Sequence, residues 1–386
     1  MKTLHVIYRG WREHWQLGTL ADSGRQLLFE YSPSALREGL QLSPLHLPLR
    51  ERAYADGPRF FHGLPGLIAD ALPDGWGLLL MDRAFRKMGR DPAGVSPLER
   101  LALIGERAIG ALTFEPADAA DLDAAAASLL ELARKVERLS AGAGADVLRE
   151  MLLIGGSPPP DAAPWLFKFP ARGEHAEVCA VEELYACLAR ACALEMPDSR
   201  FVPLGRGLAA FGVRRFDREA GLRVPVHTVG GALHADYRIP SIDVIDFLKL
   251  TRLLTRDERE VRRAYARCAF NLLFNNRDDH VKNFSYRLTV DRHWRLAPAY
   301  DLTFNAGPAG HHQMAYAGET GAPSRADLLR AAHHGEVAPA AAKRIIEAML
   351  EVAPRLTALG AELPIRKATL KRIDKIVALN QAWLAS

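Results

Sequence analysis

The sequence predicts an α+β chain in which a strand-rich N-terminal part precedes a mostly helical C-terminal part. Segments 3–8 (TLHVIY) and 26–31 (QLLFEY) carry the β-branched and aromatic residues of strands, with glycine and serine between them. Apolar residues recur at helical spacing over 76–85 and again up to Phe274. With 386 residues, 49% of them hydrophobic and 25% charged, the chain has room for two or three domains.

Capping residues mark a further helix in the N-terminal part. Ser96 is an N-cap candidate, Pro97 takes the first helical position, and Glu99 completes a capping box. A short strand should follow this helix. The Ala- and Leu-rich stretch 117–151 is predicted to be a helical linker. We therefore expect three domains, at 1–120, 121–240 and 241–386.

The middle and the end of the chain alternate strands with helices. A Gly/Pro loop leads to an apolar strand at 165–169, a long helix over 178–196 and a strand that begins at Leu208. Segments 284–290 and 293–298 read as two short strands around a tight turn at Asp291. The end of the chain, from about Ala342, reads as two amphipathic helices broken at 360–364.

Composition excludes several classes of protein. A formal net charge of +4 is too small over this length to indicate nucleic-acid binding by charge alone. The four cysteines show no CxxC pairing, which is typical of free thiols in a reducing compartment. No stretch reaches the roughly 18 apolar residues of a membrane span, and the N-terminus lacks a secretory pattern. We expect a soluble cytoplasmic protein without a membrane partner.

The polar stretch FNNRDDHVKNFSY, at 274–286, follows a run of buried character. It could be a solvated turn after a helix. The predicted hairpin, however, folds the chain back and should bring Asp301 beside Asp278 and Asn283. Carboxylate and amide oxygens suit Mg²⁺ together with substrate phosphates. Asn283 and Asp301 are therefore the candidate metal ligands, and Asp278 is the candidate base.

Asp278 precedes Asn283 by five positions, the spacing of the base and the metal-binding Asn in protein-kinase catalytic loops. A kinase also needs a strand lysine. Lys168 lies in an otherwise apolar strand, where it requires a charged partner or a ligand unless it snorkels from an edge. Glu177, Glu182 and Glu183 are candidate partners for it. The upstream turn Gly155-Gly156-Ser157 could hold phosphates or be an ordinary loop.

Four separated motifs, in this order, resemble the HipA family of serine/threonine kinase toxins from bacterial toxin–antitoxin systems. They are ADALPDGWG (69–77), WLFKFP (165–170), VRRFDR (213–218) and NRDDHVKNFS with LAPAYDLT (276–285, 296–303). The resemblance covers nearly the whole chain. It implies a β-rich N-terminal subdomain plus a protein-kinase-like bilobal fold with a mostly helical C-terminal lobe.

The resemblance also implies roles for single residues in the binding of ATP and Mg²⁺. Asp278 would be the catalytic base, Asn283 and Asp301 would hold Mg²⁺, and Ser157 matches a serine on which family members phosphorylate themselves. The residues implied to bind or border ATP are Gly155, Gly156, Ser157, Lys168, Arg214, Arg215, Phe216, His280, Lys282, Asn283, Tyr300 and Asp301. From the residues alone, VRRFDR reads as a strand end with a solvated charge cluster.

The implied function is an ATP- and Mg²⁺-dependent protein kinase toxin whose target is a translation component such as an aminoacyl-tRNA synthetase. The implied partner is a small helix-turn-helix antitoxin of the HipB type, with DNA contacted only through it. The loop before Lys168 departs from the family pattern, because it contains a run of three prolines, which have no N–H to donate to phosphate, and no lysine. The alternatives are a catalytically weak nucleotide-binding protein that retains the antitoxin contact, or a small-molecule phosphotransferase.

Other conspicuous residues are expected to be structural. Asp70, Asp74 and Trp76 belong to a turn and to the helix after it. His311 and His312 lie in a Gly/Pro-rich loop and are predicted to be a solvent-exposed pair rather than metal ligands.

Overall fold

The computed structural model describes residues 2–55, 57–73, 75–117, 163–170, 174–205 and 208–386. The chain divides into two compact units. Unit 1 comprises 1–164, 217–234 and 287–293, and unit 2 comprises 165–216, 235–286 and 294–386. The predicted linker, most of 117–151, and the candidate phosphate turn at 155–157 lie outside the described residues.

Unit 1 contains an antiparallel sheet with the strand order β4-β3-β2-β1-β5. The strands are β1 (Thr3–Tyr8), β2 (Trp15–Asp22), β3 (Leu27–Tyr31), β4 (Ala53–Ala55) and β5 (Leu112–Glu115). The predicted strands at 3–8 and 26–31 are confirmed as β1 and β3. The strand β2 was not predicted, because its glycine at position 18 reads as a turn. A Cβ at Gly18 would lie 2.3 Å from the Glu30 carbonyl oxygen, so the close approach of β2 to β3 requires glycine.

Short helices complete the first segment of unit 1: α1 (Pro33–Glu38), η1 (Arg59–Phe61), α2 (Gly66–Ala69), α3 (Gly75–Lys87), η2 (Pro92–Gly94) and α4 (Pro97–Ile104). The capping box of α4 is present as predicted, with Ser96 and Glu99 bonding to each other's backbone N–H. The second segment adds β9 (Arg218–Glu219), β10 (Leu222–Arg223), β11 (Val226–Thr228) and α8 (Val229–Leu233).

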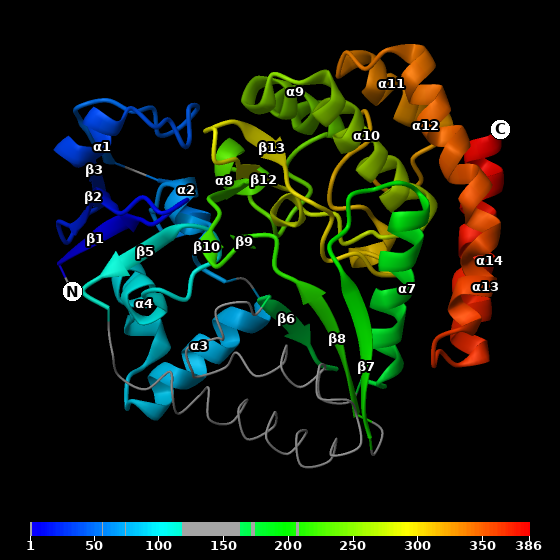
Figure 1. Cartoon of the computed structure of the whole chain (residues 1–386), viewed down its shortest axis with the longest axis horizontal. Helices are drawn as coiled ribbons and strands as arrows, with labels where there is room; N and C mark the ends of the chain where they lie inside the picture. The colour runs from blue at the N-terminus through cyan, green and yellow to red at the C-terminus, as the bar shows by residue number, and fades with distance from the viewer. Residues whose placement is uncertain (1, 56, 74, 118–162, 171–173, 206–207) are drawn as a thin grey trace. The chain divides into compact units, whose positions relative to one another are not determined.

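Unit 2 begins with a second antiparallel sheet, in the order β6-β8-β7. Its strands are β6 (Trp165–Lys168), β7 (Ser199–Gly205) and β8 (Leu208–Arg214), and the long helix α7 (Glu177–Ala191) lies along it (Figure 1). Cys179 and Ala186 of α7 form a buried cluster with Ala209, Phe211 and Val213 of β8. This packing fixes α7 against the strands and so sets where β6 presents Lys168.

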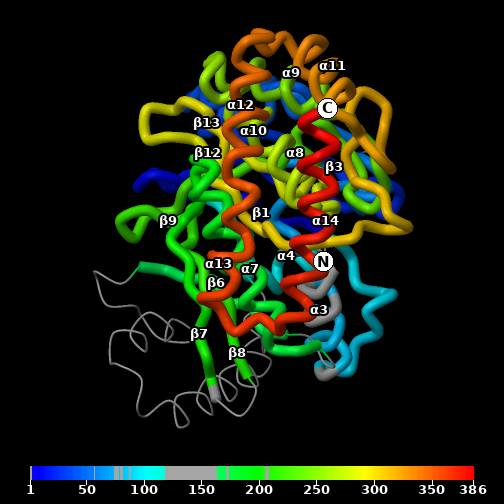
Figure 2. The backbone as a smooth tube through the Cα atoms, turned by 90° about the vertical axis from the view of Figure 1, so that its right-hand side faces the viewer, coloured from blue at the N-terminus to red at the C-terminus, as the bar shows by residue number. Residues whose placement is uncertain are grey.

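The rest of unit 2 is mostly helical, as predicted. It contains α9 (Val244–Thr255), α10 (Glu258–Leu273), η3 (Val281–Asn283), β12 (Ser285–Leu288), β13 (Trp294–Leu296), η4 (Pro308–Gly310), α11 (Arg325–His334), α12 (Pro339–Val352), η5 (Ala353–Arg355), α13 (Leu356–Ala361) and α14 (Lys367–Ala385). The strand β12 begins in unit 2 and ends in unit 1, to which residues 287–293 belong. The predicted hairpin strands are present as the sheet neighbours β12 and β13. Figure 2 shows α12 and α14 side by side. In the described part of the chain, no helix is both long and apolar enough to span a membrane.

Candidate active site

The polar stretch at the end of α10 forms a loop held by asparagines rather than a solvated turn. The loop leaves the helix at Asn275, whose φ of 54° is left-handed, a backbone conformation that asparagine tolerates better than most residues. The Asn276 side chain donates to Asn271 Oδ1 at 3.0 Å, and the Asn275 side chain donates to the Asn305 carbonyl at 3.0 Å. These buried amides fix the backbone just before Asp278.

The short helix η3 orients the second half of the loop. His280 is its N-cap and accepts from the Lys282 N–H through Nδ1 at 3.3 Å. The Asn283 side chain donates to the Asp278 carbonyl at 2.8 Å, across the five-residue spacing noted in the sequence. Because the amide nitrogen of Asn283 is used in this way, its Oδ1 remains available to a cation.

Asp278 is the more exposed of the two successive acids of this loop, with a side chain 36% exposed. Burial raises its pKa, and the nearby carboxylates of Asp301 and Asp279 act in the same direction. His280, at 3.9 Å, and a hydrogen bond from Gln313 act against that rise. A carboxylate with a raised pKa is a better proton acceptor near neutral pH than an ordinary aspartate.

Lys168 joins two carboxylates that come from different elements of unit 2. Its Nζ lies 2.8 Å from Glu182 of α7 and also forms an ion pair with Asp301. Although burial opposes the charged form of the lysine, the two acids raise its pKa above the ordinary value. Burial would raise the pKa of Asp301, but the lysine more than offsets this and lowers it. The lysine ammonium and the Asp301 carboxylate thus each favour the charged form of the other.

Of the three acids considered as partners for Lys168, the structure selects Glu182. Glu177 binds Arg366 and Glu183 binds Arg190 instead. The alternative in which Lys168 snorkels alone from an edge strand is wrong, because its ammonium is held by the two carboxylates.

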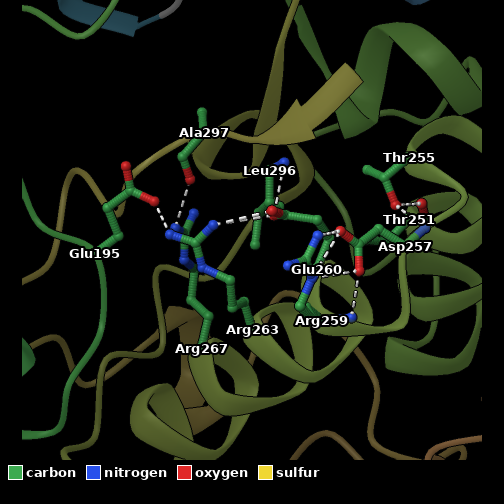
Figure 3. A network of polar contacts seen from close by, with 10 residues as sticks. All are labelled: Glu195, Thr251, Thr255, Asp257, Arg259, Glu260, Arg263, Arg267, Leu296 and Ala297. Carbon is green, nitrogen blue, oxygen red and sulfur yellow. Dashed lines mark hydrogen bonds and ion pairs between the residues drawn. The ribbon is translucent and has the colours of Figure 1, made fainter. Parts of the chain in front are cut away.

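The backbone leading to Asp301 is anchored by charged side chains of α10 (Figure 3). The Leu296 N–H donates to Glu260 at 3.1 Å, and Arg267 donates to the Ala297 carbonyl at 2.7 Å. Arg267 is only 4% exposed, and burial lowers its pKa to about 10. The Ala299 N–H bonds to the Glu195 carbonyl at 2.6 Å. Asp301 itself has a φ of 56°, so this anchored approach ends in a left-handed aspartate.

The Arg214–Phe216 segment leads from the end of β8 to this region. The Phe216 ring stacks on Tyr300, with centroids 5.2 Å apart and planes inclined by 28°. The Tyr300 hydroxyl donates to the Lys282 carbonyl at 2.7 Å, which ties the ring to the catalytic loop. Arg214 is exposed, 3.6 Å from Asp198, and Arg215 is half-buried.

The donor set fits Mg²⁺ better than a metal that prefers nitrogen or sulfur. The candidate ligands offer one carboxylate, from Asp301, and one amide oxygen, from Asn283. Within the described ranges, no group of three or more His, Cys, Asp or Glu side chains forms a metal cage. Magnesium bound through few protein oxygens and substrate phosphates needs no such cage.

Sequence reasoning missed the segment that holds the loop from the other side. His312 is 1% exposed and its Nδ1 lies 2.8 Å from Asp279, so the prediction of an exposed histidine pair is wrong for His312, although His311 is exposed. Tyr237 was also missed: its ring centroid lies 5.8 Å from that of His280 and 5.2 Å from Lys282 Nζ. The sequence offers one sign of this segment, the two successive carboxylates Asp278 and Asp279. When one of two neighbouring acids faces the core, it needs a buried hydrogen-bond donor from elsewhere in the chain.

Comparisons with known proteins agree with these motifs. The model of the HipA N-terminal domain matches residues 9–115, and that of the HipA-like C-terminal domain matches 117–356. A chain of the Shewanella oneidensis MR-1 complex of the toxin–antitoxin system HipA, HipB and its operator DNA is similar at 18% identity and a TM-score of 0.69, over 99% of this chain and 97% of that one.

A second similar structure is the Helicobacter pylori proinflammatory kinase CtkA. It has 9% identity and a TM-score of 0.41, over 58% of this chain and 88% of that one, too low to argue from. No curated protein sequence matches the chain. Because the two family models together span 9–356 almost without a gap, this chain belongs to the HipA family.

Proposed function

We propose that this chain transfers the γ-phosphoryl group of ATP to a serine or threonine hydroxyl of a protein. The observation that carries the proposal is the Lys168–Glu182–Asp301 cluster, found in the same unit as Asp278 and Asn283 at their five-residue spacing. Kinases need a strand lysine paired to a helix glutamate, a base and two oxygen ligands for magnesium.

The residues of the candidate site divide the reaction among them, and Glu182 would hold Lys168 in place. Lys168 and the Phe216–Tyr300 stack would bind the phosphates and the base of ATP. Asp278 would take the proton of the acceptor hydroxyl as the new O–P bond forms and the bond to the ADP oxygen breaks. Magnesium, held by Asn283 and Asp301, would neutralise charge on the phosphates. Positioning and charge supply most of the acceleration in such transfers.

The biological setting is part of the proposal. The similar Shewanella structure is a complex of HipA, HipB and operator DNA. We infer that this chain acts as the toxin of such a pair, with a small helix-turn-helix antitoxin as partner and DNA contacted only through it. A translation component such as an aminoacyl-tRNA synthetase is the proposed protein substrate.

The test compares the wild-type chain with Asp278→Asn. Each is incubated with γ-labelled ATP, Mg²⁺ and a mixture of purified aminoacyl-tRNA synthetases, and phosphoserine and phosphothreonine are located by mass spectrometry. We expect labelled protein with the wild type and a loss of about 10²- to 10⁴-fold with Asp278→Asn. Asp291→Asn, the same substitution at an exposed turn position, is the matched control and should keep wild-type transfer.

The outcomes separate the alternatives. Equal labelling by the wild type and Asp278→Asn would show that Asp278 is not the base. ATP binding without transfer, together with an intact antitoxin complex, would favour the catalytically weak binding protein. Label that appears only on free sugars or antibiotics added as acceptors would favour a small-molecule phosphotransferase.

A further inference from the structure

The segment 312–316 hydrogen-bonds to both of the successive carboxylates of the catalytic loop, Asp278 and Asp279, but with different groups. The inner one, Asp279, is 1% exposed and anchors the segment: its Oδ1 accepts the Gln313 N–H at 2.7 Å, and its Oδ2 lies 2.8 Å from His312 Nδ1 and 3.2 Å from the Tyr316 hydroxyl. The Tyr316 hydroxyl also lies 3.1 Å from the Cys268 carbonyl oxygen in α10. The backbone of Gln313 is therefore fixed to the core of unit 2.

From this fixed backbone the Gln313 side chain reaches the outer carboxylate. Its Nε2 donates to Asp278 Oδ1 at 3.0 Å, and His280 Nε2 lies 3.9 Å from the same oxygen. Among the residues that the structure describes, none hydrogen-bonds to Asp278 Oδ2. The side chain as a whole is 36% exposed, and Oδ2 is the oxygen that no described donor occupies. The two oxygens of Asp278 are thus not equivalent.

We propose that Gln313 is a positioning residue that holds Asp278 Oδ1 and so presents Oδ2 as the oxygen that accepts the proton of the acceptor hydroxyl. This inference rests on the proposed function. A carboxylate held at one oxygen by a fixed donor loses its freedom to rotate about the Cβ–Cγ bond. Its second oxygen then points in one direction, which is the preorganisation that proton transfer requires.

The different roles of the two Asp278 oxygens determine the path of the proton. As the acceptor oxygen bonds to the γ-phosphorus and the bond to the ADP oxygen breaks, the hydroxyl proton moves to Oδ2. Oδ1 keeps its hydrogen bond from Gln313 throughout. Among the described residues, the Gln313 side chain hydrogen-bonds only to Asp278, so its loss should slow the transfer step and leave the binding of ATP unchanged.

The experiment measures kcat and the KM for ATP of the full chain with Gln313→Met, Gln313→Glu and Gln313→Lys. Methionine keeps the length of the side chain without a donor, glutamate keeps the shape but places a charge beside Asp278, and lysine restores a donor. We expect kcat to fall about tenfold in Gln313→Met, the effect of one lost hydrogen bond to a charged group, with KM unchanged. The kcat of Gln313→Glu should be lower still, and the kcat of Gln313→Lys should return most of the way to the wild-type value.

Gln381→Met is the matched control. Gln381 Nε2 donates to the Leu350 carbonyl at 2.9 Å, so the same substitution removes the same kind of bond in the same unit without touching the loop. It should leave kcat unchanged. The urea midpoint of each variant separates a positioning effect from poor folding, and it should be equal in the two methionine variants.

Three results would overturn the inference. One is wild-type kcat in Gln313→Met. Another is a failure of Gln313→Lys to recover activity while its urea midpoint is normal. The third is a rise in the KM for ATP that accounts for the whole loss. Failure of the proposed function itself shows earlier, as a wild-type chain without Asp278-dependent transfer, and it removes the basis for this inference as well.

Discussion

Each unit contains, among its described residues, a buried histidine–aspartate pair, and the two pairs have nearly the same geometry. In unit 1, His227 Nδ1 lies 2.7 Å from Asp70 Oδ2, and in unit 2, His312 Nδ1 lies 2.8 Å from Asp279 Oδ2. All four side chains are at most 5% exposed. The residue types and distances alone do not tell the two pairs apart.

The difference lies in what each aspartate connects. Asp70 accepts from the backbone N–H and the hydroxyl of Thr228, and the far nitrogen of His227 lies 3.0 Å from Ser43 Oγ. This is the residue set of a hydrolase triad, but Ser43 is only 2% exposed and no substrate can reach it. Asp279, in contrast, is preceded in the sequence by Asp278, whose side chain is 36% exposed. Exposure of the neighbouring group, not the composition of a polar cluster, therefore distinguishes a site from a structural network.

Among substitutions in the two histidine–aspartate pairs, Asp279→Asn should reduce activity most. Asparagine cannot accept from His312, Tyr316 and the Gln313 backbone as the carboxylate does, so the segment that positions Asp278 should shift. A displacement of about 1 Å at a reacting group costs on the order of 10²-fold in rate. We expect a loss of that size in kcat, together with a lower urea midpoint.

The kinetics of refolded Asp279→Asn check this prediction. Full kcat in a variant whose midpoint has fallen would show that Asp279 is as purely structural as Asp70.

The next effect is on stability alone. Asp70→Asn removes the acceptor that holds Thr228 and His227 in the core of unit 1, and breaking a buried pair of this kind costs about 3 kcal/mol of unfolding free energy. Phosphoryl transfer per folded molecule should be unchanged. Urea unfolding followed by transfer assays on the folded fraction measures both quantities. A drop in kcat larger than the loss of folded protein would make unit 1 part of the chemistry.

The smallest effect concerns a structural carboxylate within unit 2. Hydrogen bonds from Arg366 lower the pKa of Glu177 from 4.5 to about 2 although burial opposes this. The folded-state pKa is thus below the unfolded value, so this group stabilises the fold above pH 4.5 and loses that contribution as the pH falls toward 2. Glu177→Gln should be less stable than the wild type at pH 7, and the gap should close in acid.

Urea unfolding at several pH values between 2.5 and 7 tests whether the stability difference between Glu177→Gln and the wild type shrinks as the pH falls. Glu362→Gln, the same change at an exposed residue of unit 2, is the control and should follow the wild-type curve. A gap that widens as the pH falls would contradict the assignment of Glu177.

Elements with local signals could be predicted from the sequence. The capping box of Ser96, the strand β1 and the hairpin around Asp291 depend on neighbouring residues, and all three are present. The strand β7 was missed, because Pro203 interrupts its pattern and its pairing with β8 is a tertiary contact.

In the candidate site, too, local features could be predicted from the sequence and tertiary contacts could not. The spacing of Asp278 and Asn283 and the isolated charge of Lys168 were visible in the sequence. The choice of Glu182 over its neighbours was not, because it depends on how α7 packs on β8. Gln313 could not be found either, since it reaches Asp278 across 35 positions of sequence from an irregular segment.

The left-handed backbone of Asp301 determines how its role should be tested by mutagenesis. A φ of 56° is tolerated by aspartate and asparagine but strains alanine and most other residues. Asp301→Ala would therefore mix two losses, that of the carboxylate and that of the local chain conformation. Asp301→Asn removes the charge with little strain, and Asp301→Gly removes the side chain while accepting the angle. A loss of activity can be assigned to the carboxylate only if both of these variants show it. An alanine substitution alone would not separate the carboxylate from the backbone conformation at this position.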